Sequence, residues 1–412
     1  MDSLTRRNFL ASMGTIAAGG LAGMSLTEAL AQPIDKLAEH IPQTVLGATG
    51  WKTPIIGFGT LFYAYMTKER PEELLNDKES DLLLNTGIDL GINVFETGIG
   101  YGNAEYRISR VLPNHKRDKL FISSKTTKRD KDGILKEIEK SLATLKTDYL
   151  DMYQIWDCVD IREYQQTIGK DGAFEGLKQA QKEGKIRFTG LTGHSVRVHM
   201  EALRFGEFDS HLIAYSPVCR EFERCLTLAA KIKKAVMIMK PYGWGITWGK
   251  HGGVLSSSSE DPGQVPDKLT DEEALRFVLS NPGVTIACPG HSSLEYLKRN
   301  VAIAATFKPL TPQERKKIIA TADRIRGGVC GLCEGKPCEK VCPNDVPISW
   351  LMSNLQYMHR FFIHRQVGEL YTALPHDYLD CDGCGECEKG CPKKFAIRKD
   401  MKEAHDIIRI GY

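Results

Sequence analysis

Short apolar runs alternate with longer amphipathic segments along the chain from about residue 55. The runs have strand length, whereas the segments between them repeat their apolar residues every three or four positions, as helices do. One such helix is predicted at Gly133–Leu145. The predicted strands are Ile55–Thr60, Ile92–Thr97, Lys119–Thr126, Tyr149–Ile155, Ile186–Gly193, His211–Ser216, Val236–Pro241 and Val284–Gly290. Continuous apolar strands joined by helices indicate a parallel sheet that is buried on both faces.

Eight strand–helix units over roughly 250 residues predict an α/β fold of the (β/α)8 TIM-barrel type. An open, doubly wound sheet is the alternative, but no Gly-x-Gly-x-x-Gly motif opens the first helix. In barrels of this type the catalytic side chains lie at the C-terminal ends of the strands. We therefore expect the functional residues at those ends.

The composition is that of an ordinary globular protein. Of 412 residues, 42% are hydrophobic and 26% are charged, which excludes a disordered, coiled-coil or collagen-like chain. The formal net charge is only +3, and the basic residues do not cluster as a nucleic-acid-binding surface requires. We therefore expect no nucleic-acid partner.

The first 31 residues contain the three parts of an export signal. Arg6 and Arg7 precede a Gly- and Ala-rich apolar stretch, 11–26, and Ala29-Leu30-Ala31 follows as a small-residue cleavage site. The paired arginines resemble a twin-arginine signal, which delivers folded proteins to the export machinery. A membrane span and a chance arginine pair are the alternatives, and the stretch is short for a span. The sequence predicts a signal at 1–31 and a periplasmic or otherwise exported protein, or a cytoplasmic one if the signal is not used.

Stretches on the predicted strands resemble the aldo/keto reductase family from about Leu46 to Phe307. They are Leu46–Gly50 with Gly57–Thr60, Gly91–Thr97 with Tyr101–Glu105, Phe121–Thr126 with Tyr149–Ile155, and Cys288–Ser293 with Asn300. This family reduces carbonyl groups with a hydride from a nicotinamide. The resemblance therefore implies an oxidoreductase that acts on a small carbonyl or alcohol substrate.

The resemblance also implies three catalytic residues. Tyr101 matches the family's proton donor, and Lys125 matches the lysine beside it. A free tyrosine has a pKa of about 10, and a nearby ammonium lowers that pKa because it favours the phenolate. Glu96 stands where the family has an aspartate that keeps the lysine charged and oriented, so the charge is kept on a longer side chain.

The fourth catalytic position departs from the family. Members usually place a histidine after the fourth strand to hydrogen-bond the substrate carbonyl, whereas this chain has Trp156. An indole offers one hydrogen-bond donor and no acceptor, and it cannot titrate. Either the substrate is unusual, or the activity is residual, or the barrel no longer reduces carbonyls.

The resemblance further implies a binding site for NAD(P). The expected cofactor-binding residues come from several strand ends and from the segment that resembles the family's adenosine-phosphate site: Thr60, Thr192, Lys240, Gly290, Ser292 and Asn300. Many members carry a basic residue for the 2′-phosphate of NADP where this chain has Tyr296, which favours NAD without excluding NADP.

Eight of the 12 cysteines lie in the last hundred residues, in two closely spaced sets. The first set is Cys330, Cys333, Cys338 and Cys342, and the second is Cys381, Cys384, Cys387 and Cys391. The second set has the spacing of a bacterial ferredoxin run, in which the fourth cysteine binds the other cluster. We therefore expect two [4Fe–4S] clusters, one on Cys330, Cys333, Cys338 and Cys391, and one on Cys381, Cys384, Cys387 and Cys342.

Zinc and disulfides are the alternatives for these cysteines. Zinc sites rarely end in the Cys-Pro pair that closes both sets, at Cys342-Pro343 and Cys391-Pro392. Disulfides would suit an exported protein, but a protein exported in folded form can receive its clusters in the cytoplasm first. The sequence therefore predicts a small α-helical, ferredoxin-like iron–sulfur domain.

The complete prediction has three parts: the signal at 1–31, the barrel at 32–310 and the iron–sulfur domain at 311–412. We expect an exported iron–sulfur oxidoreductase that uses a nicotinamide, or electrons delivered by the clusters from an electron-transfer protein or a quinone-linked donor. The alternative is a non-enzymatic electron-transfer or scaffold protein whose barrel has lost carbonyl reduction. The substrate, the redox partner and the oligomeric state do not follow from the sequence.

Overall fold

The computed structural model describes residues 24–61, 76–158, 161–243, 269–327, 330, 333, 336–352, 371 and 374–410. They divide into two compact units. The first contains the barrel and covers Met1–Gly243 and Asp271–Arg315, and the second covers Trp244–Thr270 and Lys316–Tyr412. Within these ranges no helix combines the length and apolar character that crossing a membrane requires.

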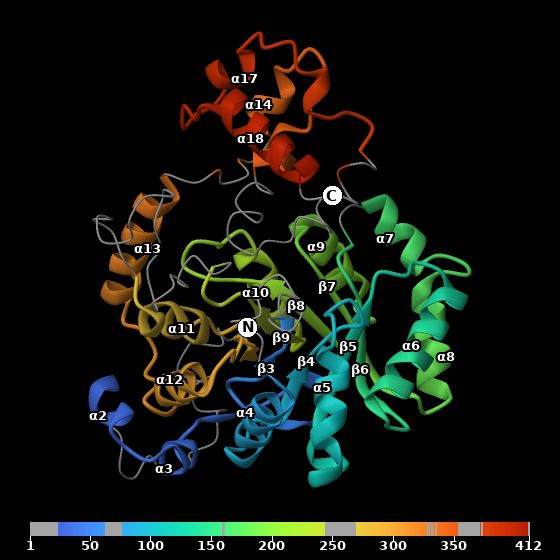
Figure 1. The fold of residues 1–412 in the computed structure, drawn as a ribbon, viewed down its shortest axis with the longest axis vertical. Coiled ribbons are helices and arrows are strands. Elements are labelled where there is room, and N and C mark those ends of the chain that lie inside the picture. Colours follow the sequence, from blue (N-terminus) through green and yellow to red (C-terminus); the bar gives the residue numbers. More distant parts are fainter. Residues whose placement is uncertain are drawn as a thin grey trace, which may run out of the picture. The chain divides into compact units, whose positions relative to one another are not determined.

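The first unit is built around eight parallel strands (Figure 1). They are β3 Phe58–Gly59, β4 Val94–Glu96, β5 Phe121–Thr126, β6 Leu150–Ile155, β7 Ile186–Gly193, β8 Ser210–Ala214, β9 Ala235–Met239 and β10 Ile286–Ala287. Each strand pairs with the next in chain order. The first and last strands also meet, because Gly57 N–H donates to Ala287 O at 2.8 Å and Ala287 N–H donates to Ile55 O at 3.0 Å. The sheet is therefore closed, which confirms the predicted (β/α)8 barrel.

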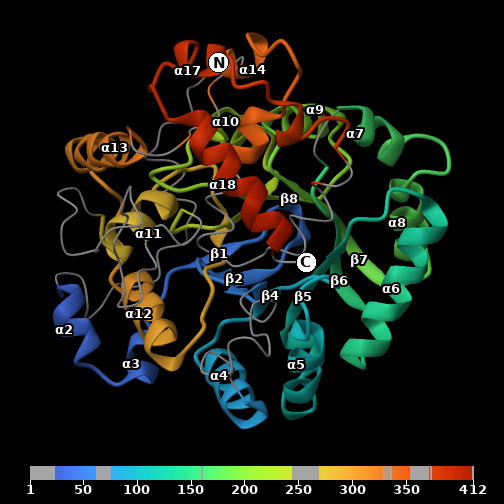
Figure 2. The same ribbon diagram turned by 45° about the horizontal axis from the view of Figure 1, so that its top comes forward.

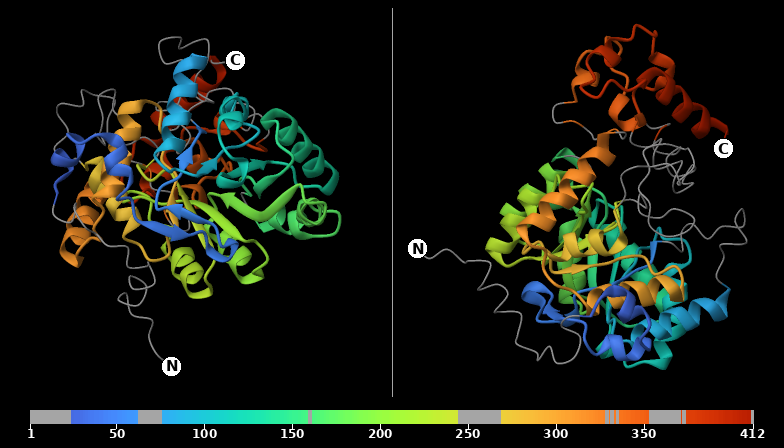
Figure 3. Two further views of the ribbon diagram at one scale, coloured as in Figure 1. Left: turned by 90° about the horizontal axis from the view of Figure 1, so that it is seen from below. Right: turned by 90° about the vertical axis from the view of Figure 1, so that its left-hand side faces the viewer.

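A helix follows every strand and lies outside the sheet (Figure 3, left). The helices are α4 Asp77–Asp89, α5 Ala104–Val111, α6 Lys131–Leu145, α7 Ile161–Ile168, α8 Ala173–Lys182, α9 Val196–Phe205, α10 Glu223–Ile232, α11 Asp271–Leu279 and α12 Leu294–Ala305. In α6 the Asp130 carboxylate accepts from Gly133 N–H at 2.7 Å and caps the first turn. Ile134 and Ile138 are buried on the face that packs against the barrel. The apolar periodicity thus predicted this helix correctly.

Apolar side chains fill the barrel near the N-terminal ends of the strands. Val94, Phe121 and Met237 belong to one buried cluster there. Leu46, which directly precedes the 3-10 turn η1 Gly47–Thr49, belongs to the same cluster. This turn joins β1 Gln43–Val45 and β2 Lys52–Pro54, an antiparallel hairpin visible in Figure 2. Trp51 anchors it, because its indole N–H donates to the Asn93 side chain at 3.3 Å just before β4. The hairpin therefore covers the N-terminal end of the barrel, opposite the strand ends at which functional residues are expected.

Part of the predicted signal belongs to the first unit. Helix α2, Leu26–Leu30, begins with a capping box between Ser25 and Glu28, and Ala29 is fully buried. Helix α2 and the following α3, Ile34–Ala38, both contact α12. The arginine pair and residues 11–23 lie outside the described residues.

The second unit is small and helical. Beyond α13, Pro312–Gly327, which begins in the first unit, its elements are α14 Pro337–Lys340, η7 Tyr378–Asp380, α17 Glu386–Lys389 and α18 Ile397–Ile410. Its core contains Ile348, Leu351, Ile397 and Met401, with six of the clustered cysteines in or against it.

Two halves of this unit repeat each other with a spacing of 49 residues, a relation that the cysteine spacing alone did not reveal. The short helices α14 and α17 occupy matching positions, and each is followed by a Cys-Pro pair. Three residues after each of these cysteines, Asp345 and Lys394 both have a positive φ, of 51° and 52°. The hydrogen bonds repeat too, because Glu339 accepts from Ser349 N–H at 2.8 Å and Glu388 accepts from Arg398 N–H at 3.0 Å.

Candidate active site

A buried ion pair lies at the C-terminal ends of β4 and β5. Lys125 and Glu96 are almost fully buried, and the Lys125 ammonium hydrogen-bonds the Glu96 carboxylate. The ammonium also donates to Thr97 O at 2.7 Å. The buried Tyr101 ring lies beside the same ammonium, which is 4.0 Å from the ring centroid. The structure therefore brings together three of the residues predicted to be catalytic.

Burial and mutual attraction act in opposite directions on this pair. Burial raises the pKa of Glu96 and lowers the pKa of Lys125, and the attraction between the two charges opposes both changes. A cation close to the face of an aromatic ring is attracted to it, and it stabilises negative charge that develops on that ring. Tyr101 is therefore placed beside a group that favours its phenolate.

Trp156 completes this cluster by packing instead of by a polar contact. Its ring meets the Tyr101 ring edge to face, with centroids 5.3 Å apart and planes at 89°. The loop that carries Tyr101 fits closely around the indole: a Cβ on Gly100 would lie 2.6 Å from Trp156 Cζ3. Gly100 was not singled out in the sequence, because the need for a glycine appears only when the neighbouring indole is known.

A second polar group, absent from the sequence prediction apart from Lys240, lies at the ends of β6, β7 and β9. His194 Nδ1 and an Asp157 carboxylate oxygen are 2.8 Å apart, and His194 Nε2 lies 2.6 Å from Lys240 Nζ. In the neutral imidazole, Nδ1–H donates to Asp157 while Nε2 accepts from the ammonium. We call Asp157, His194 and Lys240 the mouth trio.

The mouth trio contains two groups with shifted pKa values. Burial lowers the pKa of Lys240 to about 8, although Asp157 opposes this shift. Burial by itself would raise the pKa of Asp157, but His194, Lys240 and Arg129 together lower it to about 2. Asp157 and Lys240 both have φ of 57°, a conformation that few residues other than glycine adopt. Strained, titratable residues are typical of functional sites.

The remaining predicted cofactor residues occupy different environments. Thr60 is fully buried, and its hydroxyl donates to Glu96 O at 3.0 Å. Thr192 is buried in β7, and its carbonyl accepts from Asp157 N–H at 2.9 Å. Gly290 and Ser292 are half-buried, before the helix α12 that Ser293 caps. All four lie near C-terminal ends of strands, but their role in cofactor binding stays a prediction.

Asn300 belongs to a buried chain of hydrogen bonds. The Tyr242 hydroxyl donates to the Asn300 carbonyl oxygen, and the Asn300 amide faces His291 Nδ1 at 3.1 Å. His291 Nε2 in turn faces Gly57 O at 3.2 Å. Burial lowers the pKa of His291 to about 4, so the imidazole is neutral near pH 7 and donates to Gly57 O. Both ends of the Asn300 side chain are thus paired within the protein, which gives this residue a structural role as well.

Two buried hydroxyl groups near the barrel mouth have no hydrogen-bond partner among the described residues. They are Thr97 Oγ1, directly after β4, and Ser216 Oγ, two residues after β8. Buried polar groups are normally satisfied by protein, water or ligand. These two hydroxyls were not singled out in the sequence, because a hydroxyl side chain by itself carries no pattern.

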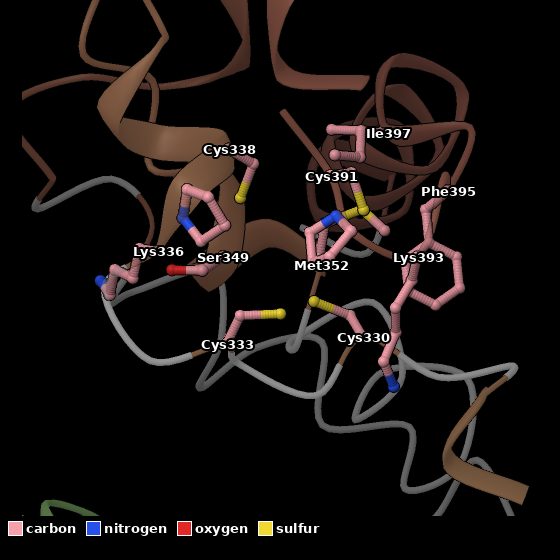
Figure 4. Close-up of a pocket in the computed structure, with 12 residues that line it drawn as sticks. Cys330, Cys333, Lys336, Cys338, Ser349, Met352, Cys391, Lys393, Phe395 and Ile397 are labelled. Atoms are coloured by element: carbon pink, nitrogen blue, oxygen red, sulfur yellow. The ribbon is translucent and has the colours of Figure 1, made fainter. Parts of the chain in front are cut away.

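The clustered cysteines surround two hollows in the second unit. Cys330, Cys333, Cys338 and Cys391 line the first, and Figure 4 shows their sulfur atoms facing the same space. Cys342, Cys381, Cys384 and Cys387 line the second. The fourth cysteine of each set thus lies with the other three-residue group, as the ferredoxin spacing predicts. Among the described residues, no three His, Cys, Asp or Glu side chains are arranged to hold a single metal ion.

A family profile and individual relatives of known sequence match the same part of this chain. The sequence profile of the aldo/keto reductase family matches residues 56–267. An uncharacterized oxidoreductase of Bacillus subtilis, YqkF, is 28% identical over 268 residues, which are 57% of this chain and 85% of the relative. The D-galacturonate reductase of Fragaria ananassa is 24% identical over 295 residues, 64% of this chain and 86% of that enzyme.

Solved structures show the same architecture. The aldo-keto reductase of Klebsiella pneumoniae in complex with NADPH is 23% identical and superposes with a TM-score of 0.52 over 69% of this chain and 94% of its own. The matching profile spans more than half of the chain and includes Glu96, Tyr101 and Lys125. The chain therefore belongs to the aldo/keto reductase family.

Proposed function

We propose that this oxidoreductase interconverts a small carbonyl compound and its alcohol at the C-terminal mouth of the barrel, with electrons from a nicotinamide or from iron–sulfur clusters of the second unit. The contact of Tyr101 with the buried Lys125–Glu96 pair carries the proposal. A proton donor, a cation that lowers the cost of its deprotonation and a carboxylate that holds the cation are what carbonyl reduction requires.

In this proposal the three side chains have separate tasks. Tyr101 donates a proton to the substrate oxygen, and the Lys125 ammonium stabilises the phenolate that remains. Glu96 and Thr97 O hold the ammonium in place by hydrogen bonds. The Trp156 ring fixes the Tyr101 ring edge to face and excludes water from it. Trp156 provides no titratable group, so the mouth trio is the other source of acid–base chemistry at this end of the barrel.

The barrel mouth suits a nicotinamide cofactor, which supplies a hydride when bound. The unpaired hydroxyls of Thr97 and Ser216 are suited to a polar ligand at the strand ends. Thr60, Thr192, Lys240, Gly290 and Ser292 remain the proposed cofactor contacts. Asn300 contributes through the chain to His291 and Gly57 that fixes α12 beside β3. The similar Klebsiella protein holds NADPH, which supports a nicotinamide in general but does not select NAD or NADP.

The second unit suits two [4Fe–4S] clusters. Each hollow is lined by four cysteines from both halves of the repeat, and thiolates are the ligands of such clusters. A zinc ion needs four sulfurs about 2.3 Å from one point, whereas no three His, Cys, Asp or Glu side chains of the described residues are arranged around a single metal ion. The proposed ligands are Cys330, Cys333, Cys338 and Cys391 for one cluster and Cys342, Cys381, Cys384 and Cys387 for the other.

The proposed maturation begins with residues 1–31 as a twin-arginine signal, followed by the barrel at 32–310 and the cluster domain at 311–412. Cleavage after Ala31 would remove α2 and uncover the part of α12 that it contacts. An exported protein meets little free nicotinamide. We therefore propose that an electron-transfer protein or a quinone-linked donor reduces the clusters after export, and that any nucleotide is bound before it.

The proposed function is tested with protein purified without oxygen. We expect NADH or NADPH to bind, and D-galacturonate or butanal to be reduced. Tyr101→Phe is expected to lower kcat by roughly 10²–10⁴-fold, because it removes the proton donor, while nucleotide affinity stays unchanged. Nucleotide binding and turnover that are equally absent from both proteins would favour the alternative, an electron-transfer or scaffold protein. Unchanged turnover in Tyr101→Phe would remove Tyr101 from the mechanism.

A further inference from the structure

The side chain of Arg129 connects three segments at the C-terminal end of the barrel. Its guanidinium donates to Thr127 O at 2.8 Å, to Trp156 O at 2.6 Å and to the Glu163 carboxylate at 2.7 Å. Thr127 follows β5, Trp156 follows β6, and Glu163 lies in α7. Only 11% of the Arg129 side chain is exposed. An arginine presents its donors in one rigid plane, so it can hold several partners in a fixed arrangement.

The backbone around Arg129 is itself fixed. Ala173 N–H, at the start of α8, donates to Arg129 O at 2.8 Å. The next residue, Asp130, pairs with Gly172 in an isolated antiparallel bridge and caps α6. The guanidinium therefore extends from a rigid position, and the segment that it binds after β6 is held relative to α6 and α8.

The bond to Trp156 O fixes the peptide group between Trp156 and Asp157. In a trans peptide the carbonyl and the N–H point in opposite directions. Arg129 binds this carbonyl, and Thr192 O accepts from the Asp157 N–H at 2.9 Å. The peptide group is therefore held at both of its polar ends, by the segment before α6 and by β7.

This peptide orientation matters because Asp157 has a φ of 57°. The left-handed region is unfavourable for a residue with a side chain, so a peptide that turned over would let Asp157 return to a common conformation. The Asp157 carboxylate, now 2.8 Å from His194 Nδ1, would then be directed away from the mouth trio. The same turn would move the backbone that places the Trp156 ring against Tyr101.

The charge of Arg129 has a smaller effect than this hydrogen bond. Burial by itself would raise the pKa of Asp157, and His194 and Lys240 oppose that change more strongly than Arg129 does. The Arg129 charge is also paired with Glu163. A substitution that removes a charge here should therefore differ from one that removes the hydrogen bond.

We infer that Arg129 is a positioning residue, which holds the peptide between Trp156 and Asp157 so that Asp157 reaches His194 and the Trp156 ring reaches Tyr101. This inference rests on the proposed function, because it gives Arg129 a part in the reaction at that site. Arg129 would act through the residues that it holds and not on the substrate.

Three variants of the full-length protein, purified without oxygen, separate the contributions. Arg129→Met removes the donors, and Arg129→Lys keeps the charge but not the planar set of donors. Glu163→Gln keeps an acceptor for Arg129 without the carboxylate charge. Hydrogen exchange of the Asp157 amide, followed by mass spectrometry, reports whether the peptide group is held. Exchange should be faster in both Arg129 variants and unchanged in Glu163→Gln.

Turnover of butanal shows whether this support matters for the reaction. Arg129→Met should lower kcat on the order of 10²-fold, as expected when a reacting group is misplaced, whereas Glu163→Gln should stay close to the parent protein. The pH profile should also change. Burial lowers the pKa of Lys240 to about 8, while Asp157 and Cys219 oppose this shift. If Asp157 moves away and His194 and Cys219 remain, the pKa of Lys240 falls, so kcat/KM should decline at a lower pH in Arg129→Met.

The outcomes separate this inference from the proposed function. Absence of carbonyl turnover in the parent protein would remove the proposed function, and amide exchange alone would then decide whether Arg129 holds the peptide. Unchanged exchange of the Asp157 amide in both Arg129 variants would overturn this inference. So would faster exchange with the kcat and pH profile of the parent protein, because Arg129 would then only stabilise the fold. Circular dichroism shows whether each variant is folded, and Arg129→Lys provides the test if Arg129→Met does not fold.

Discussion

At the scale of single residues, the site depends on Trp156, whose indole stands where the aldo/keto reductase family usually has the imidazole of a histidine. Trp156 lies against Tyr101 and occupies space that only a glycine at position 100 leaves free. Glycine and tryptophan are therefore coupled, although 55 residues separate them in the chain. The residue that departs from the family pattern therefore restricts what its neighbour can be.

Gly100→Ala is expected to destabilise the protein by about 1–3 kcal/mol, because the new methyl group would overlap the Trp156 ring. In a Trp156→Ala background the same change should cost less than about 0.5 kcal/mol, since the obstructing ring is gone. Urea unfolding of the four proteins measures this coupling. Equal costs in both backgrounds would show that the two residues do not interact.

The mouth trio gives a pH dependence with a defined sign. Lys240 has a pKa of about 8 and is charged below that pH. If its ammonium holds His194 against Asp157 during turnover, kcat/KM for butanal should fall as the pH rises through about 8. Lys240→Met should have low activity and lack this decline, whereas the exposed-surface control Lys140→Met should keep it. A decline that persists unchanged in Lys240→Met would assign it to another group.

At the scale of elements, the sequence predicted all eight strands and the helices between them, of which Gly133–Leu145 was located. Continuous apolar runs such as β6 and β7 gave nearly the observed bounds, since both faces of these strands are buried. The prediction was less accurate for β3 and β10, which have only two residues each, because the barrel closes there through isolated hydrogen bonds. Pairing across the closure joins residues about 230 positions apart, which no local pattern reports.

The candidate site was predicted only in part for a similar reason. Glu96, Tyr101 and Lys125 could be located because the family resemblance covers the strands that carry them. Asp157 and His194 have ordinary sequence surroundings, and their relation to Lys240 arises only when β6, β7 and β9 are placed in one barrel.

The packing of α9 on β8 is expected to be sensitive to acid. His199 and His211 are fully buried, with their Nδ1 atoms 3.0 Å apart. Burial lowers the pKa of His199 to about 3 and that of His211 well below its ordinary value. The unfolded chain takes up protons at these residues near pH 6.5, but the native protein does not. Their contribution to stability is therefore lost progressively as the pH falls below about 6.5.

His211→Asn removes one of these protonation sites and keeps a polar partner for His199. Between pH 6.5 and 5.5 the parent protein should lose about 1 kcal/mol more unfolding free energy than this variant. Urea unfolding followed by tryptophan fluorescence gives both values, with His40→Asn, before β1, as a control. Equal losses in the parent and the variant would mean that the buried pair does not govern acid stability.

At the scale of the whole molecule, the chain combines a barrel suited to hydride chemistry with a repeated unit suited to one-electron carriers. Both assignments come from residues at defined positions: Glu96, Tyr101 and Lys125 at the strand ends, and the eight cysteines around two hollows. The cysteine spacing predicted which residues share a hollow, because it matches the ferredoxin run in which the fourth cysteine joins the other set. The spacing could not predict which charged residues line each hollow, because that depends on how the two halves of the repeat fold together.

The most direct test of this account is the iron and acid-labile sulfide content of the full-length protein purified without oxygen. Two [4Fe–4S] clusters require about eight iron atoms and about eight sulfides per chain. Substitution of Cys338 and Cys387 by serine, singly, should each remove about half of both. Protein that is folded, fully reduced at its cysteines and free of iron and sulfide, or that contains zinc instead, would contradict the central claim.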